Sequence, residues 1–367
     1  MKISVTKDDL AQGLQAVQNV VGVRTTLPIL SNVLLLAGEN KLELRATDLE
    51  VSVHASVPAN VESEGATSLP AKRIFGLVRE IEATEIEIEV NDKEQATVKA
   101  GGGSYKIFGI GADEYPQQAN FKESTKFKVA QGKLREMIRK TAYAVSNDES
   151  RHVLKGINFV VETDRLTLVA TDGRRLALVE EEIEKGSKAE FIVPTKAVGE
   201  LQRLLQGEGD VEICLGETHV QFTMPQEGGE PIKMYSKLVE GNYPNFKQVI
   251  PGESKERVTV VKEELHHALR RADQITSDKT NSVKLTFKEN KLAITANTPD
   301  VGTGHEAIAI KYSGEEIEVA FNPAFLMDAL KVIDEDEVYF EITDNLSPGV
   351  IKSKSPFLYV LMPMRTN

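Results

Sequence analysis

The side chains that most often carry enzyme chemistry are few in this chain and lack catalytic spacing. Its six histidines include no HExxH motif, the spacing that lets two imidazoles share one zinc ion. His266 and His267 are neighbours, and adjacent helical residues point to different sides of a helix. We therefore expect a helix-surface pair rather than a joint metal site. The single cysteine, Cys214, excludes an intrachain disulfide, a cysteine-based zinc site and an iron–sulfur cluster.

Two aspartates end similar segments, but their positions do not predict catalysis. Asp48 closes KLELRATD and Asp172 closes RLTLVATD. A Thr-Asp pair after a strand typically caps a turn through a side-chain hydrogen bond, whereas acid–base catalysis needs two carboxylates in one cleft. The glycine runs at 101–103 and 109–111 lack the Lys-Ser/Thr of a phosphate-binding loop, and no GxSxG motif is present. We predict no catalytic residue, no metal and no cofactor.

The composition is that of a folded protein. Of 367 residues, 41% are hydrophobic and 27% charged, which suffices for a core. The net charge of −12 argues against nucleic-acid binding through a generally basic surface, although a local basic face remains compatible. No run approaches the about 18 apolar residues of a membrane span, and the first ten residues lack a signal-peptide core. Together with the single cysteine, this predicts a reducing cytoplasm.

The chain repeats itself three times at intervals of roughly 125 residues. KLELRATD, RLTLVATD and KLAITANT begin at Lys41, Arg165 and Lys291, and each predicts a strand. LPAKRIFGLVREI, VPTKAVGELQRLL and FNPAFLMDALKVI each place a proline before apolar residues at helical spacing. ISVTKDDLAQGLQAV, FKVAQGKLREMIRKT and VTVVKEELHHALRRA each predict a strand that runs into a helix.

These repeats predict an α+β fold of three similar domains, each with two helices packed on antiparallel sheet. Polar segments at 120–125 and 251–256 place the domains at 1–124, 125–252 and 253–367. Alternating apolar and polar residues, as at 85–90, are typical of antiparallel strands with one wet face. The predicted helices span 7–20, 71–82, 131–142, 195–206, 261–274 and 323–333.

The predicted helices carry a small net positive charge, whereas the rest of the chain is strongly acidic. In one interpretation these lysines and arginines are simply good helix formers on solvated faces. In the other, the helices face phosphate groups and the acidic exterior repels DNA. The charge pattern alone leaves both interpretations open.

Four further strings connect the chain with a known family. TLPILSNVLL, ATDGRRLAL, SKLVEGNYPNF and YVLMPMRTN begin at Thr26, Ala170, Ser236 and Tyr359. With the threefold repeat, they closely resemble the bacterial DNA sliding clamp, the beta subunit of DNA polymerase III, over the whole chain. The resemblance implies a head-to-tail homodimer whose six domains close into a ring, with twelve helices lining a hole for duplex DNA.

The resemblance also implies partners but no catalysis. An ATP-dependent clamp loader would place the ring on DNA, where it slides without hydrolysing ATP itself. The ring would tether the replicative polymerase subunit, and also repair polymerases, ligase and mismatch-repair proteins. No membrane contact is expected.

A sliding ring cannot read base edges, because specific contacts would hold it at one sequence. The resemblance therefore implies a diffuse set of contacts to duplex DNA of any sequence. The candidate DNA contacts are Arg24, Lys72, Arg73, Lys133, Arg135, Arg139, Lys140, Arg151, His152, Lys196 and Arg203. In the family an aromatic residue often meets tilted DNA in the loop before Leu154, but this chain has His152 and Val153 there.

The resemblance further implies a pocket that binds short partner peptides through apolar anchors. By position, this pocket comprises Leu154, Thr171, Gly173, Arg174, Arg175, Leu176, Pro244, Val249, Asn322, Phe325, Leu346, Val360, Met362, Pro363, Met364 and Arg365. Met362 and Met364 suit several partners because methionine adapts its shape, although a methionine pair is also typical of a core. Arg174 stands where the family often has histidine, which predicts more acidic partner peptides.

The implied ring seam joins the first domain of one chain to the third domain of the other. Its candidates are Tyr105 and Ile107 on an edge strand, facing Gln274 and Ile275 after a helix. An apolar edge strand needs a partner to avoid aggregation. Gln274 is more polar than the residue we expect at such a seam.

Two other functions are considered. A nucleotidyltransferase would need paired metal-binding carboxylates on one strand or turn, and none is apparent. A monomeric, β-rich adhesion or carbohydrate-binding protein would be expected to carry a signal peptide and disulfides. Sugar sites also often stack on aromatic residues, but the chain has no tryptophan.

Overall fold

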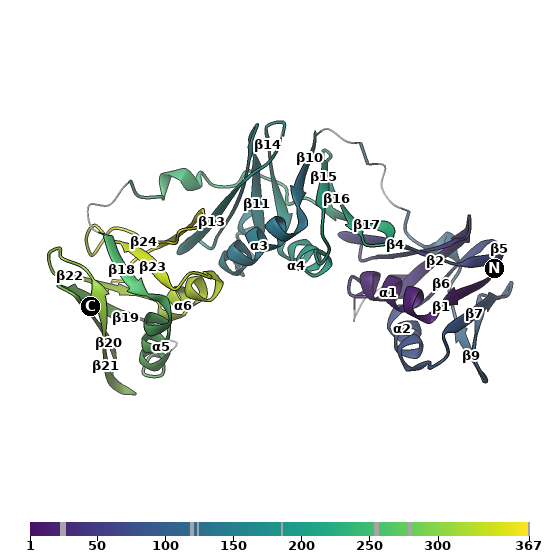
Figure 1. The fold of residues 1–367 in the computed structure, drawn as a ribbon, viewed down its shortest axis with the longest axis horizontal. Helices are drawn as coiled ribbons and strands as arrows, with labels where there is room; N and C mark the ends of the chain where they lie inside the picture. Colours follow the sequence, from purple (N-terminus) through teal and green to yellow (C-terminus); the bar gives the residue numbers. More distant parts are fainter. Residues whose placement is uncertain are drawn as a thin grey trace. The chain divides into compact units, whose positions relative to one another are not determined.

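The structure is a computed structural model that describes residues 1–22, 27–117, 121–122, 125–184, 186–252, 257–277 and 281–365 (Figure 1). Within these ranges there are six α-helices, and the strands form three sheets in which neighbouring strands run antiparallel. No helix in the described part of the chain has the length and apolar character that a membrane span requires. The predicted α+β class and antiparallel pairing are confirmed.

The chain folds into two compact units, and the central repeat contributes to both. The first unit comprises Met1–Arg135, Ile183–Ser187 and Lys196–Leu238, and the second comprises Glu136–Glu182, Lys188–Thr195 and Val239–Asn367. Strand pairing explains this division. In the first unit, strand β17 of the central repeat pairs with β4 of the first repeat. In the second unit, strand β13 of the central repeat pairs with β25 of the third.

The first unit holds two sheets. The smaller has the order β5 (Asn60–Ser63), β1 (Lys2–Thr6), β7 (Glu85–Val90), β8 (Gln95–Ala100) and β9 (Gly103–Phe108). The larger has the order β10 (Thr125–Ala130), β15 (Asp210–Leu215), β16 (His219–Gln226), β17 (Gly229–Lys237), β4 (Val51–Pro58), β3 (Lys41–Thr47), β2 (Asn32–Gly38) and β6 (Gly65–Pro70). Strand β9 therefore lies at a sheet edge.

The second unit holds one twelve-stranded sheet. Its order is β14 (Ala189–Pro194), β11 (Gly156–Val161), β12 (Arg165–Thr171), β13 (Arg175–Glu182), β25 (Phe357–Leu361), β24 (Gly349–Lys352), β23 (Glu337–Glu341), β18 (Arg257–Val261), β21 (Gly302–Lys311), β20 (Lys291–Thr298), β19 (Val283–Lys288) and β22 (Ile317–Phe321). The junction of β13 and β25 brings residues of two repeats together near the middle of the sheet.

Each repeat supplies two helices, at the positions that the periodicity predicts and ending slightly earlier. They are α1 (Lys7–Val17), α2 (Ala71–Glu80), α3 (Gln131–Thr141), α4 (Thr195–Leu204), α5 (Lys262–Asp273) and α6 (Pro323–Val332). The Thr6 hydroxyl begins α1 by accepting the Asp9 N–H at 3.1 Å. The Asn322 side chain begins α6 in the same way, and Pro323 occupies the first helical position.

The helices bury their apolar faces. In α2 the side chains of Ala71, Ile74 and Val78 are buried, at the spacing of one helix face. Figure 1 shows α1 beside α2 in the first unit and α5 beside α6 in the second. The opposite faces of α2 and α5 carry most of their charged side chains.

Candidate functional site

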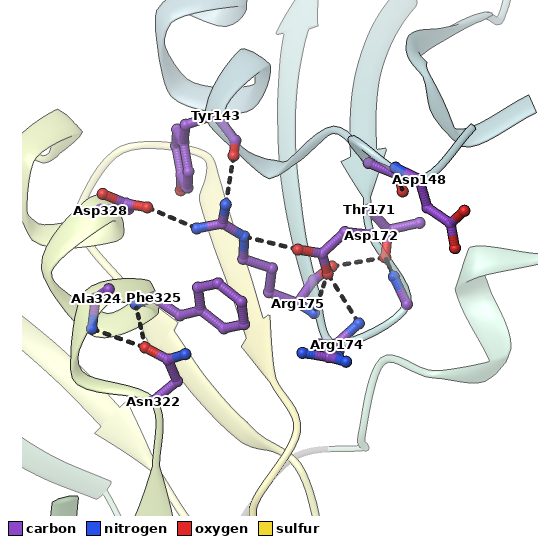
Figure 2. A network of polar contacts seen from close by, with 12 residues as sticks. Tyr143, Asp148, Thr171, Asp172, Arg174, Arg175, Asn322, Ala324, Phe325 and Asp328 are labelled. Atoms are coloured by element: carbon purple, nitrogen blue, oxygen red, sulfur yellow. Dashed lines mark hydrogen bonds and ion pairs between the residues drawn. The ribbon is translucent and has the colours of Figure 1, made fainter. Parts of the chain in front are cut away.

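Arg175 is the centre of a polar network in the second unit (Figure 2). Its guanidinium donates to Asp172 Oδ2 at 3.2 Å, to Asp328 Oδ2 at 2.7 Å and to the Tyr143 carbonyl at 2.6 Å. The Phe325 ring centroid lies 4.2 Å from its Cζ atom. Ion pairs, a charge-assisted hydrogen bond and a ring contact together hold this largely buried cation in one orientation.

Arg174 differs from its neighbour, because its side chain is exposed. Its backbone is engaged: the N–H donates to Asp172 Oδ1 at 2.9 Å and the carbonyl accepts the Met362 N–H at 2.9 Å. The two adjacent cations therefore have different surroundings. Arg175 is fixed by the fold, whereas the Arg174 side chain extends into solvent beside the C-terminal segment.

The two Thr-Asp turns have the same hydrogen bonds. Asp172 Oδ1 accepts backbone N–H groups two and three residues later, at 2.9 and 3.0 Å. Asp48 Oδ1 does the same at 2.9 and 2.8 Å. The next residue has a positive φ in both turns, 84° at Gly173 and 77° at Leu49. The predicted turn-capping role of both aspartates is confirmed.

Three predicted pocket residues share one buried apolar cluster. Leu154, Leu176 and Val360 pack there with Tyr243 and Phe246. Leu176 and Val360 are direct partners across the β13–β25 pair. The Tyr243 hydroxyl accepts the N–H of the first turn residue, Thr171, at 3.0 Å, and burial raises the pKa of this tyrosine. A neutral tyrosine thus ties the segment after β17 to the turn.

Other predicted pocket residues are exposed apolar side chains. Leu346 is 72% exposed and Met362 is 43% exposed, and Val249 and Met364 are also exposed. Val249 and Met362 line a cavity of about 450 Å³. The interpretation of the methionine pair as core residues is therefore wrong for both Met362 and Met364, because both side chains are exposed. Apolar side chains that gather at a cavity and remain in water are a candidate binding surface.

The remaining pocket candidates are half-buried or exposed. They are Thr171, Gly173, Pro244, Asn322, Phe325, Pro363 and Arg365. Asn322 Oδ1 is already used as the cap of α6. Phe325 also accepts a hydrogen bond at its carbonyl from the Tyr359 hydroxyl at 2.9 Å, and burial raises the pKa of Tyr359.

Several candidate cations lie on exposed helix faces. They are Lys72 and Arg73 on α2, Lys133 and Arg135 on α3, and Lys196 at the start of α4. Lys196 also contacts the Asp48 carboxylate. Arg151 is exposed and donates to the Asp172 carbonyl at 3.3 Å, and His152 beside it is exposed as well. Arg24 lies outside the described residues.

Three other candidate cations have structural partners. Arg139 pairs with Glu136 at 2.6 Å and with Asp334 at 2.8 Å. Lys140 is buried, with 8% of its side chain exposed, and lies 3.1 Å from Glu136. Arg203 donates to two carbonyls at the C-terminal end of α1, at 3.1 and 2.6 Å, and pairs with Glu200. Sequence position alone did not distinguish these side chains from the exposed ones.

Comparison with known proteins identifies the family. The model of the DNA polymerase III beta subunit N-terminal domain matches residues 1–119, that of the central domain matches 128–245, and that of the C-terminal domain matches 247–365. The "Beta sliding clamp" of Chlamydia muridarum is 33% identical over 367 residues, covering 100% of this chain and 99% of that protein. The chain belongs to the DNA polymerase III beta subunit family.

Relatives and solved structures agree with this assignment. The "Beta sliding clamp" of Bacillus subtilis is 30% identical over 382 residues, with full coverage of both chains. A crystal structure of the Pseudomonas aeruginosa DNA polymerase III subunit beta has a TM-score of 0.94 at 31% identity and covers all of both chains. The Bartonella birtlesii clamp bound to griselimycin has a TM-score of 0.92 at 34% identity, again over the whole of both chains.

Membership in this family decides between the functions considered above. The chain is a DNA sliding clamp, a non-catalytic processivity subunit of polymerase III. Its three domains have the clamp fold. The nucleotidyltransferase and carbohydrate-binding alternatives are therefore set aside.

The candidate seam residues of this clamp differ in exposure. Tyr105 is exposed on the edge strand β9, but Ile107 is 6% exposed and packs into its own unit. Phe108, the next residue on this strand, is 71% exposed. After α5, Gln274 is exposed and Ile275 is half-buried.

Glu263, His266 and His267 lie together on α5. One possible ligand atom from each lies within 4.8 Å of the other two. The expectation that the two histidines point apart is therefore wrong, because residues three and four positions after Glu263 share its helix face. Burial lowers the pKa of His266, and its Nε2 atom has no hydrogen-bond partner among described residues. This is a residue group of the described chain that could hold a divalent ion.

Sequence analysis missed the residues that orient Arg175. Asp328 lies on α6, 153 residues away in sequence, and no local signal links the two. Tyr143 contributes a carbonyl, which any residue could supply. Tyr243 and Phe246 of the buried cluster could be found in the sequence, since they belong to the string SKLVEGNYPNF.

Proposed function

We propose that this clamp acts as a head-to-tail homodimeric ring that encircles duplex DNA and holds partner proteins through short peptides. The proposed domains are 1–124, 125–252 and 253–367. The observation that supports the ring is that each unit has an unpaired strand edge with an exposed or half-buried apolar side chain near it, and that these two edges differ: the terminal strand β9 in the first unit and the unpaired part of β21 in the second. Exposed strand edges are liabilities that proteins normally cover or pair. Two different edges on one chain suit a heterologous contact, which closes into a ring where the rotation allows.

The first open edge is β9, which pairs only with β8 among the described strands. The second belongs to β21. Residues 302–309 of β21 pair with β20 on one side, whereas β18 pairs with this strand only at Ile310 and Lys311. We infer that β9 of one chain pairs with this part of β21 in the other. Tyr105 and Phe108 would then be covered by the partner, together with Ile275.

The proposed DNA contacts are weak and independent of sequence. Lys72, Arg73 and Arg135 are exposed and form no ion pair with the described residues, so their charge is available to phosphates. Such contacts release counterions and weaken steeply with salt. Topological linkage through the ring then provides the residence time that a few surface cations cannot.

The proposed peptide pocket combines a buried apolar base, which we call the floor, with an exposed side chain that can adapt its shape. Leu176 and Val360 supply the buried floor, and Met362 supplies a polarisable, flexible wall. Arg175 is fixed in orientation by its network, while the exposed Arg174 favours acidic groups in the bound peptide. The proposed occupants are the replicative polymerase subunit, the clamp loader and other proteins that carry such a motif.

Size-exclusion chromatography with light scattering tests the ring. We expect a mass near twice 40.4 kDa for the wild-type chain. The double variant Tyr105→Asp/Phe108→Asp should give one-chain mass, since it places charge at the seam. Leu346→Asp is the control, because it adds a charge at an exposed apolar side chain outside β9 and β21 and should stay dimeric. A one-chain mass for the wild type at every concentration would overturn the proposal.

Retention on DNA tests encirclement. After loading, wild-type protein should remain on nicked circular plasmid through a high-salt wash and leave when the plasmid is linearised. Equal loss from both forms would contradict encirclement while leaving the dimer measurement valid.

A further inference from the structure

A second cavity, of about 600 Å³, lies within the first unit. It is bounded by the end of β3, the Thr47–Val51 turn, β4, β16 and β17, and by the segment at 112–117. It is larger than the cavity beside Met362. None of the interactions described above uses it.

This cavity occupies the place in the first repeat that the proposed peptide pocket occupies in the second. Both adjoin a Thr-Asp turn with matching hydrogen bonds. Both adjoin an antiparallel pair that joins two repeats: Ser52 faces Tyr235 across β4–β17, as Leu176 faces Val360 across β13–β25. A Tyr-Pro dipeptide borders each one, Tyr115-Pro116 here and Tyr243-Pro244 there. Duplication of the domain therefore produced two sites of similar construction.

Several aromatic and basic side chains line this cavity. Tyr115 is buried and donates to the Arg45 carbonyl at 3.2 Å, and the Tyr235 ring lies 5.1 Å from that of His54. Burial lowers the pKa of His54 to about 4, so this imidazole is neutral near pH 7.

Among the cations that line the cavity, Arg45 is already paired with Glu43 at 2.7 Å. The ammonium group of Lys237 has no ion pair with the described residues. Lys237 therefore offers a free positive charge at the wall, and Glu50 is the acidic residue of the lining.

Leu49 is an unusual residue at the mouth. Its φ of 77° lies in the left-handed region, where the equivalent turn of the second repeat has Gly173. This backbone conformation is unfavourable for a residue with a bulky side chain. Its side chain is nevertheless 45% exposed and lines the cavity. The fold thus maintains a strained backbone that holds an apolar side chain in water, which points to a contact with something outside the chain.

We propose that this cavity is a second peptide-docking site, which takes a partner segment carrying an apolar anchor next to a carboxylate. The anchor would pack between Leu49 and Tyr115, and the carboxylate would pair with Lys237. The inference rests on the proposed function, since the pocket at Leu176 and Met362 is its precedent for peptide binding. A clamp with two such sites per chain could hold two partners, or one partner at two points, and so gain avidity.

Selection from a random twelve-residue phage library against the full-length dimeric protein tests this. Enriched peptides are then synthesised and their affinities measured for wild type, Leu49→Gly, Lys237→Glu and Met362→Asp. Leu49→Gly removes the apolar wall but suits the positive φ, so the protein should keep or gain thermal stability. We expect one peptide class, rich in Asp or Glu beside an apolar residue, to weaken at least tenfold with Leu49→Gly and with Lys237→Glu. That class should bind Met362→Asp as it binds wild type.

The other outcomes separate this inference from the proposed function. If the selected peptides depend on Met362 and none depends on Leu49 or Lys237, the second site is refuted and the first pocket stands. If peptides depend on Leu49 and Lys237 and none on Met362, the proposed partner pocket fails instead. Displacement of the Lys237-dependent peptides by millimolar pyrophosphate, with equal binding of peptides that lack the apolar residue, would make the cavity an anion site and overturn peptide docking.

Discussion

Arg203 is a candidate DNA contact whose hydrogen bonds within the protein instead give it a structural role. Its guanidinium donates to the Gln15 and Ala16 carbonyls at 3.1 and 2.6 Å and to Glu200 at 2.8 Å. These carbonyls belong to the last turn of α1, where backbone oxygens lack helical partners and a cation is favoured. The residue therefore joins a helix of the central repeat to a helix of the first. We predict that Arg203→Gln weakens the first unit and leaves DNA affinity nearly unchanged.

The magnitude follows from these three contacts. A hydrogen bond to a charged group contributes about 1.5–3 kcal/mol when it is buried, but 25% of the Arg203 side chain is exposed. Screening and partial rehydration of the carbonyls reduce the total. We expect a loss of about 1–3 kcal/mol in the free energy of unfolding, or roughly 2–12 °C in Tm for a unit of this size.

Arg73→Gln is the matched control, because Arg73 is exposed and forms no ion pair with the described residues. It should leave Tm unchanged and reduce the slope of log K for DNA against log salt by about 0.9. Differential scanning calorimetry and salt-dependent anisotropy with a labelled duplex measure the two effects. The reasoning is refuted if Arg203→Gln keeps the wild-type Tm and lowers the salt slope as Arg73→Gln does.

Three further predictions concern the pocket and the response to acid. Leu176→Ala should cost about 2–5 kcal/mol of stability because this side chain is buried, whereas Leu346→Ala should cost less than about 0.5 kcal/mol; chemical denaturation compares them. Met362→Asp should weaken a polymerase-derived peptide at least tenfold in calorimetric titration without changing dimer mass, and an unchanged affinity would remove Met362 from the pocket. Burial opposes the charge of Glu136, but Arg139 and Lys140 outweigh it and lower its pKa. The group therefore stabilises the fold above its unfolded pKa and loses this effect as pH falls through the lower folded value. Glu136→Gln should flatten Tm between about pH 5 and 3, and a wild-type profile would contradict this.

Local features of the fold were predictable because their causes are local. The six helices follow from apolar periodicity and from caps such as Thr6 and Asn322, each of which acts within three residues. The turns at Asp48 and Asp172 follow from side chains that bond their own backbone. Helix ends were less accurate, since the last turn of a helix is held mainly by packing.

Resemblance to the family named candidate site residues, but the sequence did not predict how they are arranged. Resemblance gave positions for the pocket, and Leu154, Leu176 and Val360 do share one buried cluster. It gave no means to separate Ile107, which is buried, from Phe108, which is exposed, because a shift of one residue in strand register exchanges the two faces. It also grouped Lys140 and Arg203 with exposed cations, although Lys140 is buried beside Glu136 and Ser355 and Arg203 is bonded to carbonyls of α1.

The sequence by itself determined the threefold repeat, the α+β class, the helices, the two capped turns and the family. Only the tertiary structure decided which strand edges stay open, which cations are already paired, and that a cavity stands beside the Thr47–Val51 turn. The physical reason is the distance along the sequence over which each interaction acts. Periodicity and capping act over a few residues, whereas the partners of Arg175 and Arg203 are up to 153 and 188 residues away. Such contacts form only when sheets of different repeats join, and no short segment of sequence records that.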